Sequence, residues 1–254
     1  MHKLSVITLA LNEEHNIDEC LASVRWADEL IVVDSGSMDK TVELAKKHTK
    51  LVLEVEWLGY GATKNLALQK ATGDWVLWLD ADERVTPELA EEIKHILKRD
   101  DASVVAYDVA RRAYFLGKWI RHSGWYPGRV TRLFKRGNGQ FTESRVHEQL
   151  VIDGRVGCLE NDLLHYTDPG LHHYFLKFNR YTSLAAEDLR AAGRSAGLYD
   201  LTVRPVFQWV KMYLLRRGFL DGVEGFVLAI VSSLYVFVKY AKLWELQRKG
   251  QQDG

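Results

Sequence analysis

Four short apolar runs in the first hundred residues, each followed by a stretch with helical spacing, constrain the fold most strongly. The runs cover 4–11, 30–34, 51–57 and 75–80. Apolar runs of this length, rich in β-branched residues, are typical of parallel strands covered on both faces. Helical stretches follow them near 14–24, 40–48, 61–71 and 87–98. Thr86 can cap the last helix, and Pro87 suits its first turn. The alternation predicts an α/β fold with a doubly wound, mostly parallel sheet.

Polar side chains gather where the predicted strands end. They follow the first, second and fourth runs, and they are Asn12, Glu13, Asp34, Ser35, Asp80 and Asp82. In open parallel sheets, ligands bind beyond the carboxyl ends of the strands. We therefore expect these side chains to surround a bound ligand.

Asp80 and Asp82 are separated by one residue and directly follow an apolar strand. Carboxylates two residues apart on a strand point the same way. Hard divalent cations such as Mg²⁺ or Mn²⁺ take one or two carboxylates together with phosphate oxygens of a substrate. For an isolated Asp-x-Asp, a solvated turn before a helix is the better explanation. The position after a strand in a βα series favours a metal bound with a nucleotide.

The loops after the second and third strands also bear on a nucleotide. Asp34, in IVVDSGSMDKT, is placed to accept a hydrogen bond from a base or a ribose. The segment GYGATKN superficially matches a dinucleotide fingerprint, but it follows the third strand and its sixth position is Lys64 rather than Gly. This disfavours a Rossmann oxidoreductase, and Lys64 at a helix start can instead face a nucleotide.

Together these segments resemble the family 2 inverting glycosyltransferases, which have the GT-A fold. The resemblance covers about residues 3–100 and rests on SVITLALNEEHNI, IVVDSGSMDKT and ATKNLALQKATGDWVLWLDADE. It implies a nucleotide-sugar donor whose base and ribose contact Thr8, Asn12, Glu13, Asp34, Lys64 and Asp80. It also implies a divalent cation, Mg²⁺ or Mn²⁺, bound by Asp82 and Asp80, with His165 as a further candidate ligand.

Later motifs look like the bacterial lipopolysaccharide inner-core glucosyltransferase branch. They are VHEQL, LLHYT, RP, LDG and YAKLWE. The implied reaction moves glucose from UDP-glucose to a heptose of the lipopolysaccharide inner core. Such a direct displacement needs a base for the acceptor hydroxyl, and Glu148 is the predicted base. Glu148 can alternatively be a surface acid, in which case Asp153 and Glu143 are the next candidates.

Two other functions compete with this interpretation. Within the same class, the acceptor can be a polyprenyl phosphate or another cell-surface glycan. A nucleotidyltransferase also uses an α/β sheet with acids on a metal, but it usually has a Gly-rich, basic loop after the first strand. The corresponding segment here, LALNEEHN, is acidic.

The stretch 109–142 combines eight Lys and Arg with interleaved aromatic residues and no acid. Such a composition suits single-stranded nucleic acid. The formal net charge of zero and the acids at the strand ends weigh against a nucleic-acid partner. A phosphorylated saccharide acceptor requires the same groups, and we expect Arg129 to contact phosphate and Trp125 or Tyr126 to contact a sugar face.

We expect a GT-A catalytic domain over 1–200, with a nucleotide-sugar half (1–100) and an acceptor half (101–200), and a helical tail over 201–254. The tail has eight Lys and Arg against four acids. Its longest charge-free apolar run, 225–238, is shorter than the roughly 20 residues of a spanning helix. Its helices can lie on an anionic membrane surface or bury against the catalytic domain or a second subunit.

The two cysteines, Cys20 and Cys158, lack metal-binding spacing and suit a reducing cytoplasm. The first residues turn polar too soon for a signal peptide. We therefore expect a cytoplasmic enzyme held peripherally on the cytoplasmic face of the inner membrane, where it meets a lipid-linked saccharide acceptor.

Overall fold

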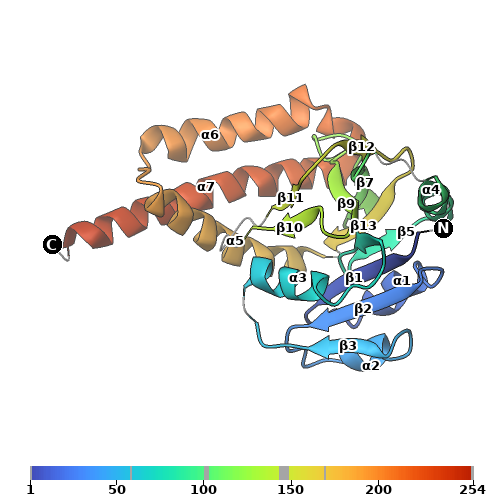
Figure 1. Cartoon of the computed structure of the whole chain (residues 1–254). Coiled ribbons are helices and arrows are strands. Elements are labelled where there is room, and N and C mark those ends of the chain that lie inside the picture. The colour runs from blue at the N-terminus through green and yellow to red at the C-terminus, as the bar shows by residue number, and fades with distance from the viewer. Residues whose placement is uncertain (1, 58, 100–102, 143–148, 169, 253–254) are drawn as a thin grey trace. The chain divides into compact units, whose positions relative to one another are not determined.

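The computed structural model describes residues 2–57, 59–99, 103–142, 149–168 and 170–252 (Figure 1). The chain divides into two compact units. The first contains residues 1–112 and 128–165, and the second contains 113–127 and 166–254. Two strands, β7 (Arg111–Phe115) and β13 (Leu163–Asp168), run through the boundary.

The first unit is built on a seven-stranded sheet with the order β12-β6-β9-β4-β1-β2-β3. These strands are β1 (Leu4–Ala10), β2 (Glu29–Asp34), β3 (Leu51–Glu54), β4 (Trp75–Trp78), β6 (Ala106–Val109), β9 (Val130–Lys135) and β12 (Val156–Cys158). Strand β1 pairs in parallel with β2 and β4, and β2 with β3, whereas β9 runs antiparallel to β4 and β6. The predicted α/β class and mostly parallel sheet are confirmed.

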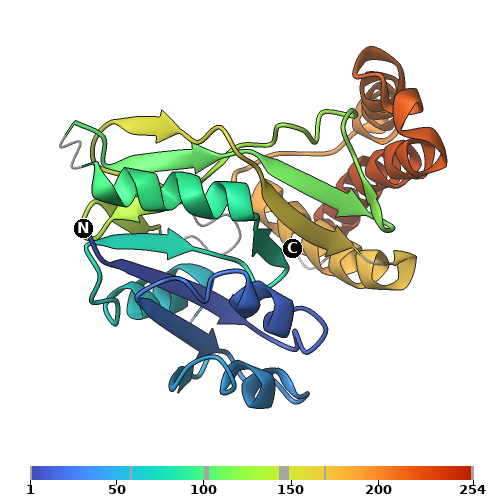
Figure 2. The same cartoon turned by 90° about the vertical axis from the view of Figure 1, so that its right-hand side faces the viewer.

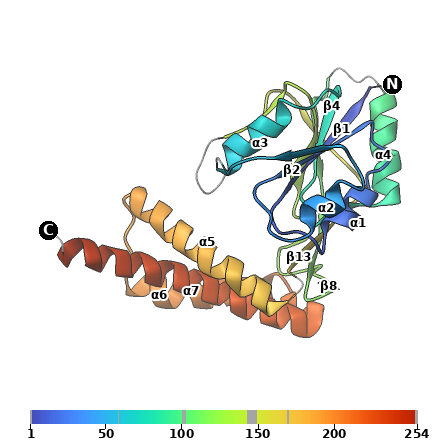
Figure 3. The ribbon, with the colours of Figure 1, turned by 90° about the horizontal axis from the view of Figure 1, so that it is seen from below.

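Helices cover both faces of this sheet because successive strand residues point to opposite sides. The helices are α1 (Ile17–Ala22), α2 (Thr41–Ala45), α3 (Tyr60–Leu68) and α4 (Pro87–Lys98). Val6 and Leu77 belong to the core cluster on the α1 and α4 side, and Ile7 and Val76 to the cluster on the α3 side. Figure 2 shows α4 lying along the strands, and Figure 3 shows α3 on the other side of the sheet.

Helix α4 begins where the sequence predicts. The Thr86 hydroxyl accepts a hydrogen bond from Leu89 N at 3.2 Å, and Pro87 occupies the first turn. The preceding strand β5 (Glu83–Val85) pairs antiparallel with β13, which aligns Glu83 with His165. A short hairpin of β10 (Gly139–Phe141) and β11 (Leu150–Ile152) adds to the first unit.

The order of the central strands fixes the location of a ligand site. Strand β1 has β2 and then β3 on one side and β4 on the other, so the direction of winding reverses between β1 and β4. The carboxyl ends of strands at such a switch point form the usual ligand crevice of doubly wound sheets. The segments that follow β1 and β4 contain Asn12, Asp80 and Asp82.

The second unit is mainly helical and confirms the predicted C-terminal helical extension. It contains β8 (Lys118–Trp119), α5 (Leu171–Ala191), α6 (Leu198–Val210), a π-helical turn η1 (Lys211–Leu215), a 3₁₀ turn η2 (Gly218–Asp221) and α7 (Gly222–Gln252). Helix α7 packs along both α5 and α6, as Figures 1 and 3 show. The Lys242 ammonium donates to the Asn179 carbonyl of α5 at 2.9 Å, and the Ser233 hydroxyl donates to the Pro205 carbonyl of α6 at 2.8 Å.

One helical segment in the described part of the chain, Gly218–Lys249, is long and apolar enough to cross a membrane by length and composition alone. Only 28% of its most apolar window is buried. The apolar helical segment is therefore longer than the charge-free run 225–238 indicated. Helix α7 continues without a break past Lys239 and Lys242.

Candidate active site

The acidic segment after β4 forms a tight turn. Strand β4 ends at Trp78, and Glu83 N donates to the Asp80 carbonyl at 2.9 Å. Strand geometry predicted that the Asp80 and Asp82 carboxylates point the same way, but the two acids lie in a turn and contact different partners. Asp80 contacts Arg132, and Asp82 contacts His165. The strand interpretation was wrong here because the backbone turns immediately after Leu79.

Three neighbouring side chains, Arg132, Lys64 and Trp78, stabilise the ionised carboxylate of Asp80. The Arg132 guanidinium is in direct contact with its carboxylate, and the Trp78 indole N–H donates to it at 3.1 Å. Burial acts to raise the pKa of Asp80, but Arg132, Lys64 and Trp78 together lower that pKa to about 2. Asp80 is therefore ionised at every physiological pH.

Arg132 also neutralises Glu83, which is fully buried. Its guanidinium donates to the Glu83 carboxylate at 2.7 Å, and that carboxylate also accepts from Asp80 N at 3.0 Å. Burial raises the pKa of Glu83, and Arg132 opposes this rise. The sequence placed Arg132 in the basic stretch but did not predict it as a site residue. The available signal was the cluster of three acids, which needs a cation nearby.

Asp82 and His165 form the pair best suited to a metal ion. The Asp82 carboxylate and His165 Nε2 lie 3.4 Å apart, and each side chain is 16% exposed. The pairing of β5 with β13 brings His165 to this position. Among the described residues, no group of three or more His, Cys, Asp or Glu could hold a metal. An oxygen–nitrogen pair fits a cation whose other ligands are phosphate oxygens and water.

Asp34 shapes the turn at the end of β2. Its buried carboxylate accepts hydrogen bonds from Gly36 N at 3.0 Å, from Ser37 N at 2.8 Å and from the Ser37 hydroxyl. Gly36 has φ of +99°, a conformation that glycine adopts without strain. The chain turns tightly after β2, and the geometry of this turn depends on the Asp34 carboxylate.

The loop after β1 is joined to the loop after β2. Asn12 N donates to the Ser37 hydroxyl, and Met38 N donates to the Asn12 side-chain oxygen, each at 2.8 Å. Glu13 N donates to the Thr41 hydroxyl at 2.7 Å. The two loops thus hold Asn12, Glu13 and Asp34 in one hydrogen-bonded layer.

Lys64 lies on α3 on the Asp80 side of the sheet. Its ammonium is 5.3 Å from the centre of the Trp78 ring and 4.9 Å from that of Phe141. Lys64 is also among the charges that lower the pKa of Asp80. Lys64 and His165 therefore both lie close enough to Asp80 to lower its pKa, and His165 also contacts Asp82.

The remaining predicted site residues lie elsewhere or outside the described part of the chain. Thr8 is fully buried within β1, and the exposed Arg129 donates to the Leu159 carbonyl at 3.1 Å. Trp125 belongs to the second unit and packs edge-on against Phe115, with ring centres 6.0 Å apart. Glu148 lies outside the described residues. The roles of these four residues stay predictions.

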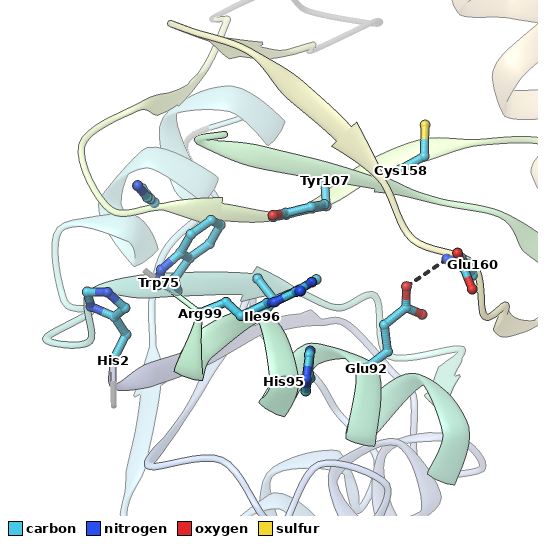
Figure 4. A pocket seen from close by; sticks show the side chains of 10 residues that line it. His2, Trp75, Glu92, His95, Ile96, Arg99, Tyr107, Cys158 and Glu160 are labelled. Atoms are coloured by element: carbon cyan, nitrogen blue, oxygen red, sulfur yellow. Dashed lines mark hydrogen bonds between the residues drawn. The ribbon is translucent and has the colours of Figure 1, made fainter. Parts of the chain in front are cut away.

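A cavity of about 790 Å³ in the first unit lies away from this site (Figure 4). It is lined at the start of β4 by Trp75, and from α4 by residues that include Glu92 and Ile96. The Glu92 carboxylate accepts a hydrogen bond from Glu160 N at 2.8 Å. None of the predicted site residues lines this cavity.

The site combines features that define the chemistry of one class of protein. The Asp-x-Asp turn after β4, the Asp82–His165 pair and Lys64 lie near the switch point of a parallel sheet. A mostly parallel sheet with acids at its switch point is the arrangement of the GT-A glycosyltransferases.

Comparison with known proteins gives the family. The family model for glycosyl transferase family 2 matches residues 5–150, and the chain therefore belongs to that family. It is an enzyme with the GT-A fold that transfers a sugar from a nucleotide-sugar donor.

Two relatives match nearly the whole chain. A lipopolysaccharide core biosynthesis glycosyltransferase of Rhizobium meliloti is 30% identical over 95% of this chain and 92% of its own length. An uncharacterized glycosyltransferase of Rickettsia prowazekii is 30% identical over 99% and 90%.

Two solved structures are also similar. Residues 1–349 of TarS from S. aureus, in complex with UDP-GlcNAc, are 17% identical with a TM-score of 0.48, covering 98% of this chain and 92% of that one. Glucosyl-3-phosphoglycerate synthase from Mycobacterium tuberculosis, in complex with Mn²⁺, UDP-glucose and phosphoglyceric acid, is 26% identical with a TM-score of 0.36, covering 45% and 44%.

Proposed function

We propose that this enzyme is a metal-dependent, inverting glycosyltransferase that moves glucose from UDP-glucose to a heptose of the lipopolysaccharide inner core. The observation that carries the proposal is the Asp82–His165 pair, 3.4 Å apart, beside an Asp80 carboxylate that is ionised at neutral pH. The relative from Rhizobium meliloti, named for lipopolysaccharide core biosynthesis, supports the assignment of the acceptor.

The residues divide between the metal and the donor. Asp82 and His165 would hold Mg²⁺ or Mn²⁺, which would neutralise the charge of the departing diphosphate. The layer formed by Asn12, Glu13 and Asp34 supports contacts to the base and ribose, because its backbone is already fixed by hydrogen bonds. Lys64 adds a positive charge on the side where a diphosphate would accumulate negative charge.

The transfer itself requires a proton acceptor on the acceptor side. Glu148 takes the proton from the acceptor hydroxyl while that oxygen attacks the anomeric carbon and UDP leaves from the opposite face. The oxygen of the acceptor forms the new glycosidic bond, and the bond from the sugar to UDP breaks. Arg129 and Trp125 are assigned to the acceptor, with Arg129 on a phosphate and Trp125 on a sugar face.

The acceptor is anchored in a lipid, which places the enzyme at the cytoplasmic leaflet of the inner membrane. A peripheral attachment through residues 201–254 confines its encounters to the membrane plane. The basic excess of this segment supports that attachment, because Lys and Arg are attracted to anionic headgroups.

A donor and acceptor screen tests the proposal. Thermal shifts with UDP- and GDP-sugars, each with and without Mn²⁺, should show the largest stabilisation for UDP-glucose with metal. Product formed from a heptose-terminated core acceptor should have an inverted anomeric configuration by NMR. A retained configuration, or full stabilisation by the donor without metal, would contradict the proposed mechanism.

A further inference from the structure

Five large apolar side chains are exposed together at the turn that joins α6 to α7. They belong to η1, η2 and the start of α7, and each is between 47% and 73% exposed. We call this surface the apolar tip, and its members are Leu214, Leu215, Phe219, Leu220 and Val223. Contiguous exposed apolar surfaces on soluble proteins mark contacts with proteins or membranes.

The apolar tip is held rigidly by a buried acid. The carboxylate of Asp221 accepts hydrogen bonds from His122 N and His122 Nδ1, both at 2.9 Å, and from Arg121 N at 3.2 Å. The Lys118 ammonium donates to the Asp221 carbonyl at 2.7 Å. This network ties the backbone of the turn to residues 118–122, so the exposure of the apolar side chains belongs to the folded turn.

Glycines at the turn allow an unusually close packing. A Cβ at Gly225 would overlap the carbonyl oxygen of Gly218, and a Cβ at Gly218 would overlap the Ser123 hydroxyl. The backbone of η2 therefore lies directly against α7, and the bulky side chains of η2 are directed outward.

Two arginines stand between the apolar groups of the tip. Arg216 and Arg217 are exposed and separate Leu214 and Leu215 from Phe219 and Leu220. The backbone of Arg216 is held by Ser123, whose N–H donates a hydrogen bond to the Arg216 carbonyl at 3.0 Å. Apolar side chains flanked by arginines suit the boundary between lipid headgroups and acyl chains, where guanidinium groups reach the phosphates.

We infer that the apolar tip inserts into the interface of an anionic bilayer, with Arg216 and Arg217 on lipid phosphates. This inference rests on the proposed peripheral attachment and identifies the side chains that make it. A second copy of the chain is disfavoured as the partner, because a two-fold contact through this tip would bring four arginines together.

Insertion at the interface also agrees better with the packing of α7 than a membrane span does. Lys242 of α7 donates hydrogen bonds to Asn179, Thr182 and Ser183 of α5. Helix α5 itself contains charged residues along its length, including Lys177 and Glu187. A spanning α7 would draw these charges into hydrocarbon, at a high cost in free energy.

Flotation with vesicles of phosphatidylethanolamine and phosphatidylglycerol tests the inference on the full chain. A Leu215→Asn, Leu220→Asn double variant should bind at least about tenfold more weakly, because each leucine no longer gains from burial in lipid. The matched control is Leu198→Asn, because Leu198 is 77% exposed at the far end of α6. It should float like the wild type. The thermal shift by UDP-glucose should be unchanged in both variants, which separates this test from that of the proposed function.

The arginines give a second, independent readout. Arg217→Gln should weaken binding at low salt and reduce its salt dependence, whereas vesicles of phosphatidylcholine alone should bind both proteins weakly. Wild-type flotation by the double variant, or an equal loss in Leu198→Asn, would overturn the inference. A tip substitution that splits a dimer in light scattering without changing flotation would also overturn it and identify a self-association surface.

Discussion

Arg132 sets the charge balance of the turn after β4. Its guanidinium contacts Asp80 and donates to the fully buried Glu83 at 2.7 Å, so that one cation serves two carboxylates. A second arginine, Arg111, also lies near the buried Glu83 carboxylate, at 4.0 Å. Asp82 instead contacts His165, so the pair proposed to hold the metal is separate from the ion pairs of Arg132.

Replacement of Arg132 by Leu should destabilise the fold at neutral pH. It leaves Glu83 buried without its cation, and we expect a loss of about 3 kcal/mol, near the lower end for a broken buried pair because Asp80 is partly exposed. Arg155→Leu, at an exposed position, is the matched control and should change stability by less than about 0.5 kcal/mol. Urea unfolding at pH 7 measures both.

The pH dependence of that loss has a definite sign. The pKa of Asp80 is about 2 in the folded protein, below its ordinary value of 3.8. Asp80 therefore stabilises the fold above pH 3.8, and this contribution disappears as the pH falls toward 2. Without Arg132 the pKa of Asp80 rises, so the difference from wild type should shrink as the pH falls from about 4 toward 2. A constant difference across this range would show that Arg132 acts through packing rather than charge.

Glu148→Gln tests the predicted base. The substitution removes the proton acceptor without changing the size of the side chain, so turnover should fall by about 10²–10⁴-fold. The dissociation constant of UDP-glucose should be unchanged, because the donor is held by other residues. Single-turnover kinetics and calorimetry separate the two quantities. Wild-type turnover would move the base to Asp153 or Glu143.

At the scale of the elements, Gly73 allows β4 to approach β1 closely. A Cβ at this position would lie 2.7 Å from Ser5 N and 2.9 Å from the Lys3 carbonyl. Gly73→Ala should therefore push β4 away from β1 and cost roughly 1–3 kcal/mol by urea unfolding. Gly197→Ala, where a Cβ meets open space, is the control and should cost less than about 1 kcal/mol. Equal effects of the two substitutions would mean that the close approach of β4 to β1 does not set the cost at Gly73.

The elements of residues 1–98 could be predicted because their signals are local. Apolar runs and capping residues marked the strands and helices, and Thr86 marked the start of α4 to the residue. Strand β9, which runs antiparallel between β4 and β6, could not be predicted in this way. Its partners are distant in sequence, and no local pattern encodes that pairing.

The candidate site shows the same limit. The acids were predictable because polar residues at strand ends meet at one edge of a parallel sheet. Their partners were not, because Arg132 reaches the site on β9. His165 was proposed from a resemblance, and the register of β13 against β5 is what brings it to Asp82.

At the scale of the whole molecule, the two proposed functions are assigned to different units. The first unit contains the switch point, the acidic turn and the Asp82–His165 pair. The second contains α5, α6, α7 and the apolar tip. This division predicts that donor binding and membrane binding respond to different substitutions, since no residue assigned to one lies in the unit assigned to the other.

The most direct test of the central claim is calorimetric titration of UDP-glucose into EDTA-stripped enzyme, with and without Mn²⁺. Wild type should bind the donor at least about tenfold more tightly with the metal, because Asp82 and His165 would hold a cation that neutralises the diphosphate. Asp82→Asn should lose this gain, and Asp18→Asn, at an exposed acid paired with His48, should keep it. Equal donor affinity with and without Mn²⁺ in the wild type, or a full metal response in Asp82→Asn, would contradict the account.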